Sequence, residues 1–270
     1  MSGRKTTSPA GSPSVTQSNF DLEFMNNANQ TAQKFLQQSA AMYHNSILSG
    51  WESLYQRKRQ KLFLALRPYH VSGHGLELGS ADGIMTEKLL PDFETLTVVD
   101  GSQIFLDQIR TRITSPKLRL VHGLFETFQP EQKYSTIFMT HIIEHLEDPV
   151  GVLKKARGWL APGGRILIAV PNAKSLHRYI GVKLGMLERI DAFNEQDVAL
   201  GHKRVYAPEM LRAHVGEAGL NIIKFGGLMV KPLSNRQIEK QWSEDLIEAF
   251  FALSEDMPEL CSEIYVVTTA

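Results

Sequence analysis

The stretch from residue 76 to residue 100 constrains the fold more than any other part of the chain. It begins with LELGSADG, continues with a helical pattern, and ends with the apolar run LTVVD, whose last residue is Asp100. Gly79 and Gly83 permit backbone conformations and a close approach of a ligand that a β-carbon would obstruct. An acid that follows the second strand can accept hydrogen bonds from both hydroxyls of a ribose. The stretch therefore predicts a strand, a glycine loop, a helix and a second strand around a pocket for an adenosine-containing cofactor.

Strand-like and helix-like patterns alternate after this unit, as expected for parallel strands joined by right-handed crossovers. Strands are expected over residues 75–78, 96–99, 118–122, 135–139, 165–170, 221–225 and 263–268. Helices are expected over residues 84–90, 103–113, 150–160, 208–218 and 236–253. The predicted fold class is therefore α/β, with a doubly wound, seven-stranded and mostly parallel sheet.

The chain divides into three parts by composition. Residues 1–19 are rich in Ser, Thr, Pro and Gly, and we expect them to form a disordered tail. Residues 20–68 carry apolar positions at helical spacing, and residues 69–270 contain the α/β pattern. The cluster RKRQK at residues 57–61 is expected to be a solvated face of the helical part.

The charge balance argues against a polyanionic partner. Lys plus Arg and Asp plus Glu each number 29, so the chain has no overall electrostatic footprint for nucleic acid or an anionic membrane. The sequence contains no run of about 18 apolar residues, and its first residues lack the apolar core of a signal peptide. The single cysteine, Cys261, fits a reducing compartment. We therefore expect a cytoplasmic protein without a membrane partner, and the charge balance argues against nucleic acid as a partner.

Five motifs in order make the chain resemble the class I S-adenosylmethionine-dependent methyltransferases, in particular the ubiquinone-pathway and natural-product O-methyltransferases. The motifs are ELGSADG, VVDGS, HGLFETF, YSTIFMTHIIEHLEDP and LAPGGRILIAVPN. The resemblance implies a Rossmann-like domain with an antiparallel last strand and a helical lid over residues 20–68. It also implies S-adenosylmethionine as the cofactor, and insertions on the acceptor side at about residues 173–207 and 227–258.

A nicotinamide dehydrogenase is the alternative interpretation of the glycine loop. A dinucleotide needs backbone donors and room for its pyrophosphate at the helix N-terminus. Here Ala81 stands in place of the second glycine of that fingerprint, and Asp82 would repel an anion. S-adenosylmethionine has no phosphate, and its ammonium and sulfonium groups are positive. An acid-bearing loop therefore favours the methyltransferase.

The resemblance implies cofactor contacts at the carboxyl ends of the first four strands. Those implied for the methionine end are Glu77, Gly79, Ser80, Ala81 and Gly83. Those implied for the ribose, the adenine and the sulfonium are Asp100, Gly101, Ser102, Leu124, Phe125, Thr140 and His141. Gly83 could instead serve only helix–sheet packing, and Leu124 and Phe125 could belong to the core.

The sequence THIIEHLED places three candidate catalytic or metal-binding side chains directly after the fourth strand. His141, Glu144 and His145 would share one face if this stretch were helical. Three interpretations are open: His145 anchors its helix, His145 or His141 removes a proton from the acceptor, or H-x-x-E-H binds a divalent metal. Related O-methyltransferases use E-x-x-E-H for a divalent ion, and this chain has His141 in the first acidic place. We therefore do not favour a metal.

A second segment, ALGHKRVYAPEML, adds His202 to the candidates. By resemblance, this loop reaches over the acceptor pocket, where His202 could complete the metal site or act as a base. Arg204 or Tyr206 could hold a carboxylate or hydroxyl of the acceptor. The alternative is a loop that only caps the following helix.

The predicted function is methyl transfer to a small-molecule acceptor in secondary or glycan metabolism, to oxygen in preference to nitrogen. Methylation of a peptide, a protein or RNA is an alternative, and so is a cofactor-binding subunit without catalysis. The helix expected over residues 236–253 could form a dimer face, so a homodimer is also open.

Overall fold

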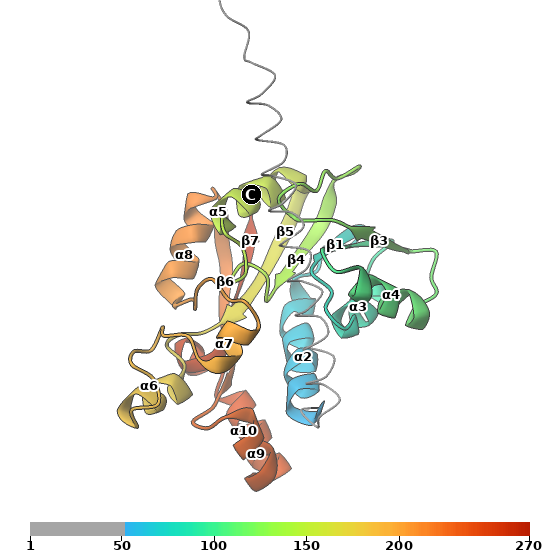
Figure 1. Ribbon diagram of the computed structural model, residues 1–270. Helices are drawn as coiled ribbons and strands as arrows, with labels where there is room; N and C mark the ends of the chain where they lie inside the picture. The colour runs from blue at the N-terminus through green and yellow to red at the C-terminus, as the bar shows by residue number, and fades with distance from the viewer. Residues whose placement is uncertain (1–51) are drawn as a thin grey trace, which may run out of the picture.

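A computed structural model describes residues 52–270 and shows a seven-stranded sheet with helices on both faces (Figure 1). The strand order is β3-β2-β1-β4-β5-β7-β6. The strands are β1 (His74–Leu78), β2 (Thr95–Asp100), β3 (Leu118–His122), β4 (Tyr134–Thr140), β5 (Leu160–Pro171), β6 (Asn221–Val230) and β7 (Cys261–Thr269). Strand β7 is antiparallel to both β5 and β6, whereas the other neighbours are parallel. All seven predicted strands and the antiparallel last strand are confirmed.

Side-chain alternation along the central strands builds two apolar layers. Ile137 of β4 and Ile168 of β5 belong to one layer, which packs on α5 (Pro149–Trp159) and α8 (Pro208–Glu217). Phe138, one position along from Ile137, belongs to the other layer. That layer packs on α2 (Glu52–Leu66), α3 (Ile84–Leu89) and α4 (Gln103–Arg112). Because successive residues of a strand point to opposite faces, apolar strands like these need cover on both sides.

Two helical segments are inserted at the carboxyl edge of the parallel strands. Helices α6 (Leu176–Lys183) and α7 (Glu195–Ala199) follow β5, and α9 (Asn235–Gln241) and α10 (Glu244–Ala252) lie between β6 and β7. In Figure 1 these four helices lie at the lower end of the sheet, and the C-terminus lies at the upper end.

The prediction of a single helix over residues 236–253 is wrong, because the structure has two helices there. Trp242 has an extended backbone, with ψ of 143°, and ends α9. The side chain of Ser243 accepts a hydrogen bond from the backbone N–H of Leu246 and thereby starts α10. A serine at this position favours an N-cap over a helix interior, which explains the break.

The predicted helical part before the sheet is only partly within the described residues. Helix α2 is its described portion, and it ends where Pro68 enters a 3-10 turn, Arg67–Tyr69. The predicted tail over residues 1–19 lies outside the described residues, as does the lid up to residue 51. Within residues 52–270, no helix is both long and apolar enough to cross a membrane.

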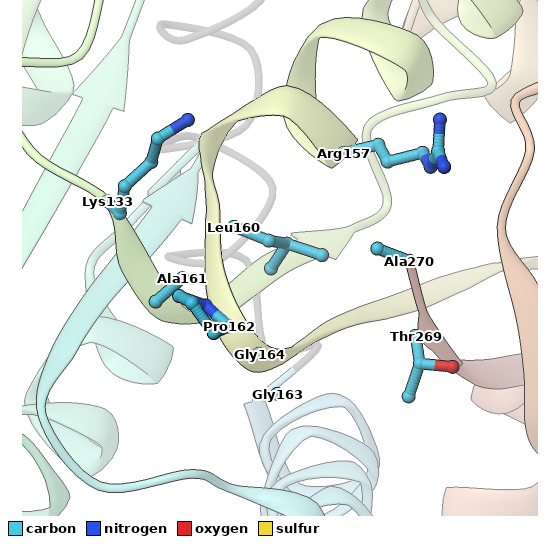
Figure 2. A pocket seen from close by; sticks show the side chains of 9 residues that line it. All are labelled: Lys133, Arg157, Leu160, Ala161, Pro162, Gly163, Gly164, Thr269 and Ala270. Carbon is cyan, nitrogen blue, oxygen red and sulfur yellow. The ribbon is translucent and has the colours of Figure 1, made fainter.

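A hollow at the amino edge of the parallel strands is separate from the predicted site. Figure 2 shows its lining: Lys133, Arg157, Leu160, Ala161, Pro162, Gly163, Gly164, Thr269 and Ala270. The hollow lies where β5 begins and where the antiparallel β7 ends. Open α/β sheets bind their ligands at the opposite, carboxyl edge.

Candidate functional site

The glycine loop after β1 adopts the backbone that its sequence predicts. Gly79 and Gly83 both have φ of +75°, and Ala81 between them has φ of 44°. A β-carbon on Gly79 would lie 2.1 Å from Cδ1 of Ile142, in the loop after β4. A β-carbon on Gly83 would lie 2.5 Å from Cγ1 of Ile109 in α4. The lack of a side chain at Gly79 therefore allows the loops after β1 and β4 to lie close together. The lack of a side chain at Gly83 allows close packing against α4, in line with the packing role considered above for this glycine.

Asp100, the last residue of β2, ties this loop to the next one. Its carboxylate accepts hydrogen bonds from the backbone N–H of Ser80 at 2.8 Å, the hydroxyl of Ser80 at 3.0 Å and the backbone N–H of Ser102 at 2.8 Å. Burial of the group outweighs these bonds and raises the pKa of Asp100. The hydroxyl of Ser102 is buried and has no hydrogen-bond partner among the described residues. Ser102 thus presents an unpaired polar group beside Asp100, where a ribose is predicted.

Two further acids, Glu77 and Asp82, line the loop. Glu77 accepts a hydrogen bond from the hydroxyl of Thr86 at 2.6 Å, whereas its Oε1 is buried without a hydrogen-bond partner in the described part of the chain. Burial raises the pKa of Glu77 to about 8. Asp82 pairs with Arg59 of α2 at 2.5 Å, and its Oδ2 is likewise buried without a partner. An ammonium group beside Glu77 would lower its pKa again and favour the carboxylate, so these unpaired carboxyl oxygens fit a cofactor with an ammonium group and do not fit a pyrophosphate.

The residues predicted for the adenine lie beside this loop. Leu124 and Phe125 follow β3 and are half-buried. Cζ of Phe125 lies 3.7 Å from the position that a β-carbon of Gly79 would take. The backbone carbonyl of Gly101 contacts the ring of His122 at 3.1 Å. The structure therefore gathers the predicted cofactor residues at the carboxyl ends of β1, β2 and β3.

The stretch after β4 forms turns, so the condition for a shared helical face of His141, Glu144 and His145 is not met. His141 has φ of 58°, which interrupts the backbone directly after the strand. The guanidinium of Arg204 then donates hydrogen bonds to the carbonyls of Ile143, at 3.0 Å, and of Leu146 and Glu147. Because Arg204 satisfies these carbonyls, the stretch keeps its turns without helical hydrogen bonds. Arg204 thus supports this loop, which favours a structural role over the acceptor contact that the sequence left open.

Tyr206, the other residue expected to contact the acceptor, is fully buried. Its hydroxyl contacts Nδ1 of His214 in α8 at 3.0 Å. Burial raises the pKa of Tyr206, so its hydroxyl stays protonated. Tyr206 packs in the apolar layer and does not face the site.

His141 lies between two carboxylates. Its Nδ1 is 3.3 Å from Oε1 of Glu144, and its Nε2 is 3.2 Å from Oε2 of Glu263 at the start of β7. Desolvation would lower the pKa of His141, but the charges of Glu263 and Glu144 outweigh it and raise the pKa to about 9. His141 is therefore a cation at neutral pH, although 39% of its side chain is exposed.

Glu144, His145 and His202 form a tight cluster next to this pair. Their potential ligand atoms all lie within 4.8 Å of one another. Glu144 is fully buried; its Oε1 contacts Nδ1 of His141, whereas its Oε2 has no hydrogen-bond partner in the described residues. Burial lowers the pKa of His145, and Nδ1 of His202 lies 3.0 Å from Oδ1 of Asp197. The structure thus brings together three of the four residues considered for a metal and leaves out His141.

Glu263 and Lys58 are site residues that sequence reasoning missed. Lys58 of α2 forms an ion pair with Oε1 of Glu263, and both side chains are buried. This corrects the expectation of a solvated face for residues 57–61. The sequence feature that could have identified them is Glu263, a charged residue at the start of the apolar run EIYVVT. A buried charge in such a strand needs a partner, and the partner is this lysine.

A methyltransferase domain family matches residues 51–224 of the chain. The chain belongs to this family. This methyltransferase is 35% identical to N-terminal Xaa-Pro-Lys N-methyltransferase 1 of zebrafish, Danio rerio, over 36% of its own length and 47% of that protein. It is 30% identical to nodulation protein S of Rhizobium tropici over 46% of its length and 55% of that protein. The chain therefore spans about half the length of these curated relatives.

Solved structures of methyltransferases share the fold. The N-methyltransferase NodS of Bradyrhizobium japonicum, in complex with S-adenosylhomocysteine, aligns over 81% of this chain and 87% of its own, with 18% identity and a TM-score of 0.51. A putative methyltransferase of Haloferax volcanii, in complex with the activator Trm112, aligns over 87% and 98%, with 15% identity and a TM-score of 0.61. The family match shows that the chain has a methyltransferase domain, and these structures show that it shares the fold of known methyltransferases.

Proposed function

We propose that this methyltransferase transfers a methyl group from S-adenosylmethionine to a hydroxyl of a small-molecule acceptor. The cluster of Glu144, His145 and His202 at the end of β4 carries the proposal. Methyl transfer from a sulfonium needs mainly alignment and exclusion of water. A hydroxyl acceptor also benefits from removal of its proton, whereas an unprotonated amine does not need it. A buried acid–base cluster therefore favours oxygen over nitrogen as the acceptor atom.

The unpaired polar groups of the loops would hold the cofactor. The free oxygen of Glu77 fits the ammonium of the methionine end, and Asp100 with the hydroxyl of Ser102 fits the ribose. Leu124 and Phe125 would contact the adenine, and Thr140 would border the sulfonium. When bound, the cofactor supplies an electrophilic methyl group.

His145 is the group best suited to receive the acceptor proton. Its lowered pKa leaves the imidazole neutral at neutral pH, and a neutral imidazole can accept a proton. His141 is already protonated beside Glu263 and would instead orient Glu144. Glu144 would in turn stabilise the imidazolium that forms on His145.

A divalent ion is a second way to activate the hydroxyl, and the unpaired Oε2 of the buried Glu144 favours it. Glu144, His145 and His202 would hold such an ion, a donor set of one carboxylate and two imidazoles. A bound ion would lower the pKa of the acceptor hydroxyl.

Calorimetry of S-adenosylmethionine binding, with metal analysis of the same protein, tests the proposal first. Turnover is then measured with phenols, aliphatic alcohols, amines and N-terminal peptides, with and without a chelator. Methylated oxygen products would support the proposal, and activity lost in chelator would assign the proton removal to the ion. Activity confined to amines or peptides would overturn the oxygen assignment, and no cofactor binding by folded protein would overturn the proposal as a whole.

A further inference from the structure

Three basic side chains meet beside the site, at the carboxyl ends of β5 and β6. Lys231 follows directly after β6 and is 7% exposed. Lys58 reaches the same region from α2, which packs against β6 and α9. His177 lies in the first turn of α6, which packs against β7. Each basic group belongs to a different element, so only the tertiary fold brings them together.

The charges of this group are not balanced. Glu263 has both carboxylate oxygens in use, Oε1 in the ion pair with Lys58 and Oε2 in the contact with His141. Lys231 donates a hydrogen bond to Oδ1 of Asn235 at 2.6 Å, which is a neutral partner. Burial, helped by the charge of Lys58, lowers the pKa of Lys231 to about 7. A buried ammonium without a carboxylate contact costs stability, and such groups are concentrated at functional sites.

Unpaired hydrogen-bonding groups accompany the lysines. Nδ1 of His177 is buried and has no hydrogen-bond partner among residues 52–270. Burial and the charges of Lys231 and Lys58 lower the pKa of His177 to about 2, so its ring stays neutral and can donate one N–H. Ser175 is fully buried at the N-cap position of α6, and its hydroxyl also lacks a partner in the described chain. The region thus offers positive charge and free hydrogen-bond donors that Glu263, already in contact with Lys58 and His141, does not use.

We propose that Lys231, Lys58 and His177 form a subsite that binds a carboxylate or phosphate group of the methyl acceptor. The proposal rests on the proposed function, because it assigns an acidic acceptor to the same active site. Glu263 links the two regions, since it contacts Lys58 on one side and His141 on the other. It also pairs in register with Pro171 of β5 and Leu228 of β6, at the edge where Lys231 emerges. An acceptor held by its anionic group would extend past Glu263 toward Glu144 and His145.

The test uses the full chain with inorganic phosphate and acetate as probes, titrated by calorimetry. We expect saturable binding that Lys231→Met weakens at least about tenfold, the loss typical of a hydrogen bond to a charged group. Lys240→Met, on the exposed side of α9, is the matched control and should leave binding unchanged. Stronger binding of phosphate assigns a phosphorylated acceptor, and stronger binding of acetate assigns a carboxylic acid.

Three results would overturn the subsite: no saturable binding of either probe, equal binding by wild type and Lys231→Met, or equal weakening in the Lys240→Met control. S-adenosylmethionine is titrated into the same samples. Cofactor binding without anion binding therefore rejects the subsite alone, whereas loss of cofactor binding from folded wild type rejects the proposed function.

Two further measurements separate a binding role of Lys231 from a structural one. Lys231→Met should unfold at the same or a higher temperature, because it removes a buried charge; a clear loss of stability would overturn the proposal. In wild type, acetate should bind more weakly as the pH rises from about 6 to about 8, since Lys231 then loses its proton. The other groups facing Lys231 are Lys58 of α2, Glu263 of β7 and His177 of α6. A flat pH profile would contradict the role of Lys231 even if the variant did not fold.

Discussion

Oε2 of Glu263 lies 3.2 Å from Nε2 of His141, although the two residues are separated by 122 positions. Glu263 starts β7 and His141 follows β4, and β5 runs between these strands. The contact forms because β7 is antiparallel, which brings the start of β7 to the edge where the parallel strands end. Through Lys58, the same carboxylate connects this edge to helix α2.

Replacement of Glu263 by Gln should change the pH dependence of stability. The pKa of His141 is about 9 in the folded protein and about 6.5 when unfolded. Its contribution is therefore fully present below about pH 6.5 and is lost as the pH rises through about 9. Chemical unfolding of wild type across this range should show the loss, and Glu263→Gln should show a smaller one. An unchanged slope would contradict the pairing.

Replacement of Asp100 by Ala should weaken S-adenosylmethionine binding by about 1.5–3 kcal/mol, the contribution of hydrogen bonds to a charged group. Asp100 also holds the glycine loop through Ser80, so both direct and indirect contacts would be lost. Calorimetry measures the change, with Asp107→Ala on the exposed side of α4 as the control. Equal affinity in the two variants would refute the role of Asp100.

Replacement of His145 by Ala should lower turnover by about two to four orders of magnitude while cofactor affinity is kept, because general-base catalysis contributes about that much. His74→Ala is the control, since His74 lies at the amino edge of β1 and contacts Thr95. Metal analysis of the two variants shows whether an ion is lost together with the activity. Full turnover in His145→Ala would leave His145 only a structural role.

Replacement of Arg204 by Lys should loosen the loop after β4. The guanidinium donates to three carbonyls from one planar group, which a lysine cannot reproduce. We expect the free energy of unfolding to fall by about 2 kcal/mol and turnover to fall with it, whereas cofactor affinity changes little. If the variant were as stable as wild type and bound acidic acceptors more weakly, Arg204 would instead be a residue that binds the acceptor.

The backbone and position of the residues proposed for the cofactor were largely predictable from sequence. Gly79, Gly83 and Asp100 act through local backbone geometry and through strand ends that adjoin in a parallel sheet. The turns over residues 141–147 were not predictable, because Arg204, which donates hydrogen bonds to their carbonyls, lies 57 to 61 positions away. Local periodicity contains no information about such a distant donor.

The sequence by itself determined the seven strands, the order of the methyltransferase motifs and the acid-bearing glycine loop, because these depend on patterns within a few residues. Only the tertiary structure decided which charges form contacts, Lys58 with Glu263 and Glu263 with His141, and that Lys231 lies near the neutral ring of His177. These contacts depend on strand order and on the direction of β7, which also determine which side chains are buried together. Burial then sets the protonation state of each group, and with it the chemistry that the group can perform.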